Sequence, residues 1–280
     1  MRPTSDAIRR FDRYELKYLV PVQQLAAIAE DLMLQMQPDR HGDRAGSYAI
    51  TNLYYDSAEL HMLHSKLAGT SYRRKLRVRV YGDSPSSTAT TAMVEIKQRL
   101  RRTTQKRRLV LSLPDAYRLC AGSAPGGTLT DGDATVAEEV SALVLGMQLR
   151  PACIVAYKRR AFVGSGFEPG LRVTFDTDLW CAPPDQTLAT PSQPHYVMPR
   201  DWSILEIKVD ERIPMWVCEL LVKHDCRLQR VSKYCLGMVS LHRLQVPTNP
   251  WASPEVAPHV AHKRPSGRSG EAPSVGARER

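Results

Sequence analysis

YRRKLRVRVY, residues 72–81, is the stretch that decides the fold. Side chains alternate across a β-strand, so one face of this stretch is apolar and the other carries Lys75, Arg77 and Arg79. Taken alone, this alternation is also typical of a sheet with one face on the core and the other in water.

A second pattern, Glu-x-Lys, recurs in three separate stretches of alternating residues. The pairs are Glu15/Lys17 in RYELKYLV, Glu95/Lys97 in AMVEIKQR and Glu206/Lys208 in SILEIKVD. A solvated face has no reason to repeat this order, and arginine suits bidentate contacts with phosphate. The set favours charged faces that meet around an anionic ligand.

The distribution of such stretches predicts an α+β fold with a closed antiparallel β-barrel and flanking helices. The interior of a barrel of about eight strands is just wide enough for side chains or one slender ligand. We expect strands near 11–20, 47–55, 72–82, 91–99, 105–113, 152–163, 170–178 and 203–209.

Helices are expected where apolar residues recur at helical spacing behind capping residues. The expected helices are Val22–Met36, a short helix capped by Asp56 and Glu59 that ends at Gly69, a helix from Thr135 to about Met147, Pro214–Lys223, and one from Ser232 to about Leu244.

Bulk properties predict one folded domain, residues 1–246, followed by a disordered Pro/Ser/Arg-rich tail, residues 247–280. The 280-residue chain carries a net charge of +10 with a pI near 9.4, which favours polyanionic partners. A nucleic-acid partner is not expected, because aromatic residues interleaved with the cations and a recognisable binding motif are both missing.

The termini and cysteines predict a cytoplasmic protein. The six cysteines show no zinc-type spacing, which indicates buried free thiols in a reducing compartment. The N-terminus has no apolar segment typical of a signal peptide, and there is no apolar run of about 18 residues that would predict a transmembrane helix. Peripheral association with a membrane stays open.

The charged faces themselves suggest a ligand. Many cations in a narrow interior need counter-charge, because burying unpaired charge is costly. A linear phosphate chain is thin and strongly anionic, and a divalent metal would reconcile the Glu residues with the phosphate. Hard oxygen ligands favour Mg²⁺ or Mn²⁺.

An ordered set of pieces runs through residues 11–238: RYELKYLVP, NLYYDS, KLRVRVYG, VEIKQR, QKRR, AYKRRAF, LRVTFDTD, ILEIK and RVSKYCLGM. In this order they resemble the VTC (vacuolar transporter chaperone) domain, the polyphosphate polymerase branch of the CYTH-like triphosphate tunnel metalloenzymes. The resemblance implies a phosphotransferase that moves the γ-phosphate of ATP onto a growing polyphosphate chain inside a cationic tunnel, with Mn²⁺ or Mg²⁺.

The resemblance also implies site residues. The catalytic set would be Arg77, Arg79, Arg159, Lys97 and Lys233, and the substrate-binding set would be Lys17, Lys106, Arg107, Tyr157, Arg230, Ser232 and Lys208. Glu206 would be the metal ligand, and Lys208 would either bind substrate or only pair with Glu206. Tyr157 fits a tunnel residue and a core aromatic equally well.

Two departures from the family pattern leave alternatives open. Arg13 stands where the triphosphatase and cyclase branches have the first Glu of E-x-E-x-K, which favours the polymerase branch. Arg230 stands where the family more often has Lys, so a non-catalytic polyphosphate-binding protein remains an alternative, as does a triphosphatase. Eukaryotic relatives attach this domain to membrane spans, so membrane coupling would here need a partner protein.

Overall fold

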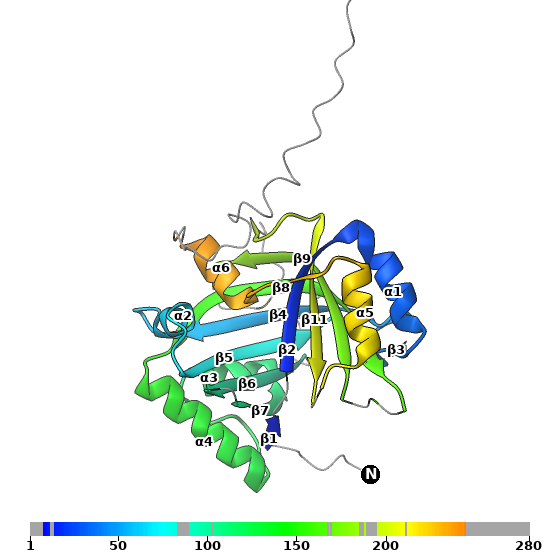
Figure 1. The fold of residues 1–280 in the computed structure, drawn as a ribbon. Coiled ribbons are helices and arrows are strands. Elements are labelled where there is room, and N and C mark those ends of the chain that lie inside the picture. The colour runs from blue at the N-terminus through cyan, green and yellow to red at the C-terminus, as the bar shows by residue number, and fades with distance from the viewer. Residues whose placement is uncertain are drawn as a thin grey trace, which may run out of the picture. The chain divides into compact units, whose positions relative to one another are not determined.

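The computed structural model describes residues 8–11, 14–82, 90–101, 103–166, 168, 170–184, 188, 195–210, 212–242 and 244. The expected tail at 247–280 therefore lies outside the described residues. The fold is mixed α+β, with helices on the outside of one large antiparallel sheet (Figure 1).

The sheet of the described chain has 12 strands, ordered β1-β7-β6-β5-β4-β8-β9-β11-β2-β12, with β10 on β9 and β3 on β8. The strands are β1 (Ile8–Phe11), β2 (Tyr14–Pro21), β3 (Met36–Pro38), β4 (Ser47–Asp56), β5 (Tyr72–Tyr81), β6 (Thr91–Leu100), β7 (Thr103–Ser112), β8 (Arg150–Gly164), β9 (Arg172–Ala182), β10 (His195–Tyr196), β11 (Trp202–Val209) and β12 (Arg227–Leu228). All eight expected strands are confirmed within a few residues. The four additional strands are only two to four residues long, too short to show alternation.

The described helices are α1 (Leu25–Met33), α2 (His61–Leu67), α3 (Leu113–Cys120), α4 (Asp131–Gly146), α5 (Met215–Lys223) and α6 (Lys233–Leu241), with a 3-10 turn at Val22–Gln24. None of the described helices has the length and apolar character needed to cross a membrane.

Several helix predictions need correction. The expected Val22–Met36 helix begins with the 3-10 turn, and its last residue, Met36, belongs to β3. The helix expected from Thr135 starts one turn earlier, because the Thr130 side chain accepts a hydrogen bond from the Asp133 amide and caps α4. α3 was not expected; Ser112 caps it in the same way.

Apolar side chains of the sheet pack outward under two groups of helices. Leu76, Val78 and Ile96 are fully buried in a cluster with α3 and α4. A second cluster joins β2, β8, β9 and β11 to α1 and α5, with Phe162 against Phe175. Figure 1 shows α1 and α5 beside β2, β9 and β11, and α3 and α4 beside β5–β7. We call the opposite face of the sheet the inner face.

The sheet is curved, but the backbone hydrogen bonds of its described residues do not form a closed ring of strands. Among the described residues, no backbone hydrogen bonds join the ends of the strand order, so the expected closed barrel is not confirmed. Two features nevertheless keep the ends near each other. β1 ends at Phe11 and β2 begins at Tyr14, which limits their separation to about 11 Å. Lys97 on β6 also contacts Glu15 on β2, six strands away in the order.

The cysteines are free throughout the described chain, as expected, but their burial varies. Cys120, Cys153 and Cys181 are buried, whereas Cys226 and Cys235 are partly exposed and Cys218 is exposed. The prediction of free thiols is confirmed, and the prediction that all are buried is wrong.

α6 approaches β8 and β9 very closely at Gly237. A Cβ added there would lie 2.8 Å from the Val155 side chain and 2.9 Å from the sulfur of Cys153. Both neighbours are buried, so neither can move away freely. Glycine at this position therefore sets the distance between α6 and the sheet.

We expect Gly237→Ala to lower the free energy of unfolding by about 1–3 kcal/mol, because the added methyl group overpacks this contact. Gly146→Ala is the matched control, since no atom lies within 4 Å of a Cβ added at the end of α4. It should leave stability unchanged or raise it by up to about 1 kcal/mol. Urea unfolding measures both, and equal stabilities of the two variants would contradict the predicted close packing.

Candidate functional site

The inner face carries charged side chains from seven strands and from α6. Cations outnumber carboxylates: the cations are Lys17, Lys75, Arg77, Arg79, Lys97, Lys106, Arg108, Arg159, Lys208 and Lys233, and the carboxylates are Glu15, Glu95, Asp176 and Glu206. The strand register explains much of the grouping, since Arg77, Arg108 and Lys17 lie opposite or beside their carboxylate partners on the neighbouring strands.

Glu95 is the centre of one group. Its carboxylate is 1% exposed and lies 2.6 Å from Arg77, 2.5 Å from Lys106 and 2.8 Å from Arg108. Burial alone would raise the pKa of Glu95, but the surrounding cations outweigh it and hold the pKa well below its usual range. Glu95 is therefore ionised and positions three cations along β5 and β7.

Arg79 is held by neutral groups instead. Its Nε donates to Asn52 at 2.8 Å, and a terminal nitrogen lies 3.3 Å from the hydroxyl of Tyr157. Asn52 is itself fixed, because its amide donates to the Val155 carbonyl. Arg79 thus keeps a full positive charge with no direct carboxylate partner among the described residues.

Tyr157 lines the inner face. The sequence alone did not distinguish this location from a place in the apolar core. Burial raises the pKa of its hydroxyl, but Arg79 and Arg159 outweigh burial, and the net pKa is lowered. The Arg159 guanidinium also lies over the ring at 5.4 Å. Tyr157 is therefore in contact with two of the expected arginines rather than packed in an apolar core.

Arg159 makes a bidentate ion pair with Asp176. Its Nε and a terminal nitrogen lie 2.7 Å and 2.8 Å from the two carboxylate oxygens. Lys233 at the start of α6 lies 2.5 Å from the same carboxylate. Burial raises the pKa of Asp176, but the two cations more than compensate and lower it to about 2.

Glu206 is the centre of a second group, with Lys208 at 2.7 Å and with Lys17 and Lys233 each at 3.8 Å. Burial raises its pKa, but the three lysines outweigh burial and hold the pKa well below the usual range. Lys208 has a pKa lowered to about 8 by burial, which its pairing with Glu206 only partly offsets.

Glu15 and Lys97 connect the two sides of the inner face. The Lys97 amine lies 2.8 Å from both oxygens of Glu15. Burial raises the pKa of Glu15, but Lys97 and the neighbouring lysines lower it to about 2. This pair lies between the group around Glu95 and the group around Glu206.

Lys75 joins the site although the sequence analysis placed it only on the charged face of its strand. It donates to the Ser232 hydroxyl at 3.1 Å and lies 4.5 Å from the centre of the Tyr234 ring. Burial, and then the like charges of Lys66, Lys17 and Lys97, lower its pKa to about 7.

α6 is anchored by Ser232, an expected substrate-binding residue, and by Tyr234 and Asp56, which the sequence did not single out as site residues. Ser232 caps the helix by accepting from the Cys235 amide. The Tyr234 hydroxyl donates to Asp56, whose carboxylate also accepts the amides of Met62 and Leu63 at the start of α2. Asp56 therefore ties α2 and α6 to β4 and fixes the start of α6 against the inner face.

Two expected site residues lie apart from the others. Arg107 is the register partner of Ile96 and pairs with Glu139 of α4 at 2.8 Å, so it belongs to the helix-covered face. Arg230 is exposed before α6. The remaining expected residues are all brought together on or beside the inner face.

The carboxylates fit a metal only partly. Among the described residues, no group of three or more His, Cys, Asp or Glu could hold a metal ion alone. Glu206 supplies hard oxygen atoms, but three lysines surround it. Mg²⁺ is commonly held by one or two carboxylates together with substrate phosphates, and Glu206 fits that shared arrangement.

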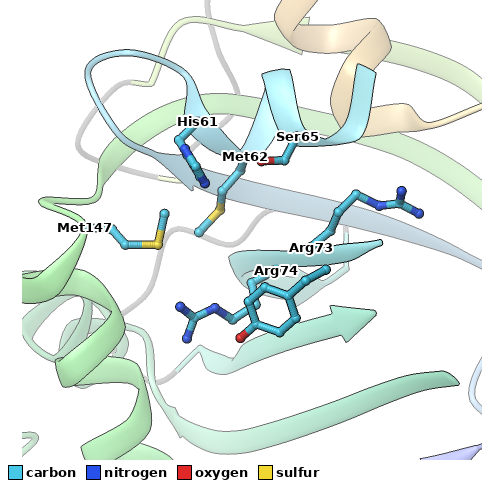
Figure 2. Close-up of a pocket in the computed structure, with 7 residues that line it drawn as sticks. His61, Met62, Ser65, Arg73, Arg74 and Met147 are labelled. Carbon is cyan, nitrogen blue, oxygen red and sulfur yellow. The ribbon is translucent and has the colours of Figure 1, made fainter. Parts of the chain in front are cut away.

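A separate hollow lies outside the inner face, between α2, the start of β5 and the end of α4. Figure 2 shows its lining, which is His61, Met62, Ser65, Tyr72, Arg73, Arg74 and Met147. It is small and lies apart from the paired carboxylates, so it is not the site described above.

Solved structures with a similar arrangement are distant in sequence. A Bacillus halodurans protein provisionally named an adenylate cyclase has a TM-score of 0.46 and 12% identity, over 81% of this chain and 95% of its own. A Hippeastrum protein described as an adenylyl cyclase with a dominant triphosphatase activity has a TM-score of 0.44 and 15% identity, over 86% and 99%. Likenesses this distant assign no activity.

Sequence comparison is more decisive. No curated protein matches the chain. The model of the VTC domain matches residues 12–242, which is nearly all of the described chain and includes every inner-face residue named above. The chain therefore belongs to the VTC domain family.

Proposed function

We propose that this protein transfers the γ-phosphate of ATP onto a growing inorganic polyphosphate chain bound along the inner face. The observation that carries the proposal is the excess of cations over carboxylates on the inner face, in a member of the VTC domain family. An extended chain with one negative charge per phosphate complements such a face along its whole length.

The arginines suit the transferred phosphoryl group. Arg77 and Arg79 are neighbours on one face of β5, and Arg159 lies against Tyr157, which contacts Arg79. Phosphoryl transfer depends on in-line positioning and on stabilising charge at the equatorial oxygens. Guanidinium groups already fixed by Glu95, Asn52 and Asp176 supply that charge without rearrangement.

The transfer step needs no protein base. A terminal oxygen of the polyphosphate chain is already ionised and forms a bond to the γ-phosphorus of ATP. The bond from that phosphorus to the β–γ bridging oxygen breaks, and ADP leaves with the electron pair. Lys17, Lys97 and Lys233 would hold the phosphates on either side of the reacting group.

Glu206 is the residue that would hold Mg²⁺ or Mn²⁺ together with phosphate oxygens. When bound, the metal would neutralise charge on the triphosphate. A phosphate chain bound between β2 and β6 would also bridge the two sides of the sheet that no backbone hydrogen bonds of the described residues join. The cytoplasmic location and a membrane partner stay predictions.

Two other functions share this site chemistry. A triphosphatase would pass the same phosphoryl group to water, and a binding protein would hold polyphosphate without reaction. Arg13, which bears on the first alternative, lies outside the described residues. Product analysis separates all three functions.

We expect purified protein incubated with ATP and Mn²⁺ to form long-chain polyphosphate, measured by gel electrophoresis alongside free phosphate. Arg77→Ala and Glu206→Ala should lower polymer formation by about 100-fold or more, because each removes charge stabilisation from the reacting group. Arg118→Ala is the control, since that side chain is 64% exposed on α3. Free phosphate without polymer would indicate a triphosphatase, and no product at all would indicate a binding protein.

We expect the affinity for tripolyphosphate to fall as pH rises, because Lys75, with a pKa lowered to about 7, must be protonated to attract phosphate. Its proton is lost in the free protein above pH 7, and binding must take it up again. The affinity should therefore fall by up to about tenfold per pH unit beyond the fall caused by other groups.

Lys75→Arg is the matched variant, because arginine stays charged across this range. Titration calorimetry between about pH 6 and about pH 9 should give a shallower pH dependence for Lys75→Arg than for the unmodified protein. The same slope in both proteins would show that Lys75 does not face the ligand.

A further inference from the structure

The charged face of β5 and β6 continues beyond the groups around Glu95 and Glu206. In the register of these strands Lys75 lies opposite Lys97, and the next inner-face row places Arg73 opposite Arg99. Like charges directly opposite each other in an antiparallel pair are destabilising. Lys97 in the first row is compensated by Glu15, whereas the repulsion between Arg73 and Arg99 in the second row is a structural cost that the fold does not explain.

The outer row differs from the inner one in its partners. Arg73 donates to the Thr70 carbonyl at 2.6 Å, and Arg99 donates to the Arg101 carbonyl at 3.0 Å. Within the described ranges, no ion pair with a carboxylate involves either arginine. Both guanidinium groups therefore keep donors and an unbalanced charge available to an anion.

Lys66 of α2 adds a third cation to this row. Burial, and then the charges of Arg73, Lys17 and Arg99, lower the pKa of Lys66. Burial and the charge of Arg99 likewise lower the pKa of Arg73. Lys66 lies on α2, which contacts β5, the strand that carries Arg73. A shared anion would relieve the repulsion among the three cations.

Arg73 lines the hollow of Figure 2, and its side chain also shares the inner face of β5 with the site cations. Side chains alternate along β5, so Arg73 shares a face with Lys75 and Arg77, whereas Arg74 shares the opposite face with Leu76. Figure 2 shows Arg73 and Arg74 directed to opposite sides of the strand. Arg74 therefore carries the same charge as Arg73, but its side chain points away from the inner face.

The spacing of the arginines along β5 indicates how long the ligand must be. Arg73 lies four residues from Arg77, which is about 13 Å along a strand, and further still from Arg79. A triphosphate bound by Arg77 and Arg79 is too short to reach Arg73. A longer chain that continues past Lys75 and Lys97 would reach it.

We propose that Lys66, Arg73 and Arg99 form a second anion subsite that binds the part of a long polyphosphate chain extending beyond the triphosphate-binding residues. The inference rests on the proposed function and adds to it a preference for long chains. Arginine donors provide bidentate contacts to successive phosphates, and the partial exposure of the subsite makes its contribution sensitive to salt.

The test compares two ligands on the full chain, namely tripolyphosphate and long-chain polyphosphate. Replacing both arginines (Arg73→Gln with Arg99→Gln) should weaken binding of the long chain by about tenfold and leave tripolyphosphate binding unchanged. Arg74→Gln is the matched control and should change neither affinity. Thermal unfolding of each variant confirms that it folds, and added NaCl should reduce the difference between the ligands.

Three results would overturn the inference. The double variant could bind the long chain as well as the unmodified protein does, or it could lose affinity equally for both ligands. It could also lose binding only to phosphatidylserine vesicles, which would identify a membrane-facing patch instead. If the unmodified protein binds neither phosphate ligand, the proposed function fails together with this inference, whereas length-independent binding contradicts this inference alone.

Discussion

The attraction between buried carboxylates and the cations around them is the interaction on which the interior of this protein depends. Glu95 joins β5, β6 and β7 through Arg77, Lys106 and Arg108, and Glu206 joins β2, β11 and α6 through lysines. Removing one partner of a buried ion pair costs about 3–5 kcal/mol, because the other charge is left without compensation. The same pairs hold the cations in fixed positions, so the proposed phosphate ligand would meet them already in place.

The sequence was sufficient for the long strands and for most of the site, because a period of two is easy to recognise over eight or more residues. Leu76 and Ile96 are buried where the alternation predicts, and Arg77 faces Glu95 across the strands. Short strands such as β10 and β12 have too few residues to show an alternation of polar and apolar side chains, and they form only because a neighbouring strand pairs with them. Likewise, the start of α4 depends on the Thr130 cap and not on Thr135, five residues later, where the helix was expected to begin.

Other parts of the site could not be predicted because they depend on register and on contacts between distant segments. In QKRR both parities are charged, and only the pairing of Arg107 with Ile96 shows that Arg107 faces α4. Asp176 lies in a strand whose alternation marks it as inward, but nothing in the sequence connects it to Arg159 or Lys233. Lys75 lay on the expected face, yet its contacts with Ser232 and Tyr234 arise only when α6 packs against the sheet.

The row of like charge formed by Arg73 and Arg99 has a consequence for the lifetime of the protein. Repulsion within this row disfavours the folded state in the absence of an anion, and the proposed ligand would raise stability by mass action because it would bind only the folded state. Because proteases act on unfolded chains, the steady-state abundance of such a protein follows the supply of its ligand. A cell that accumulates phosphate chains would thereby protect the protein that binds them from degradation.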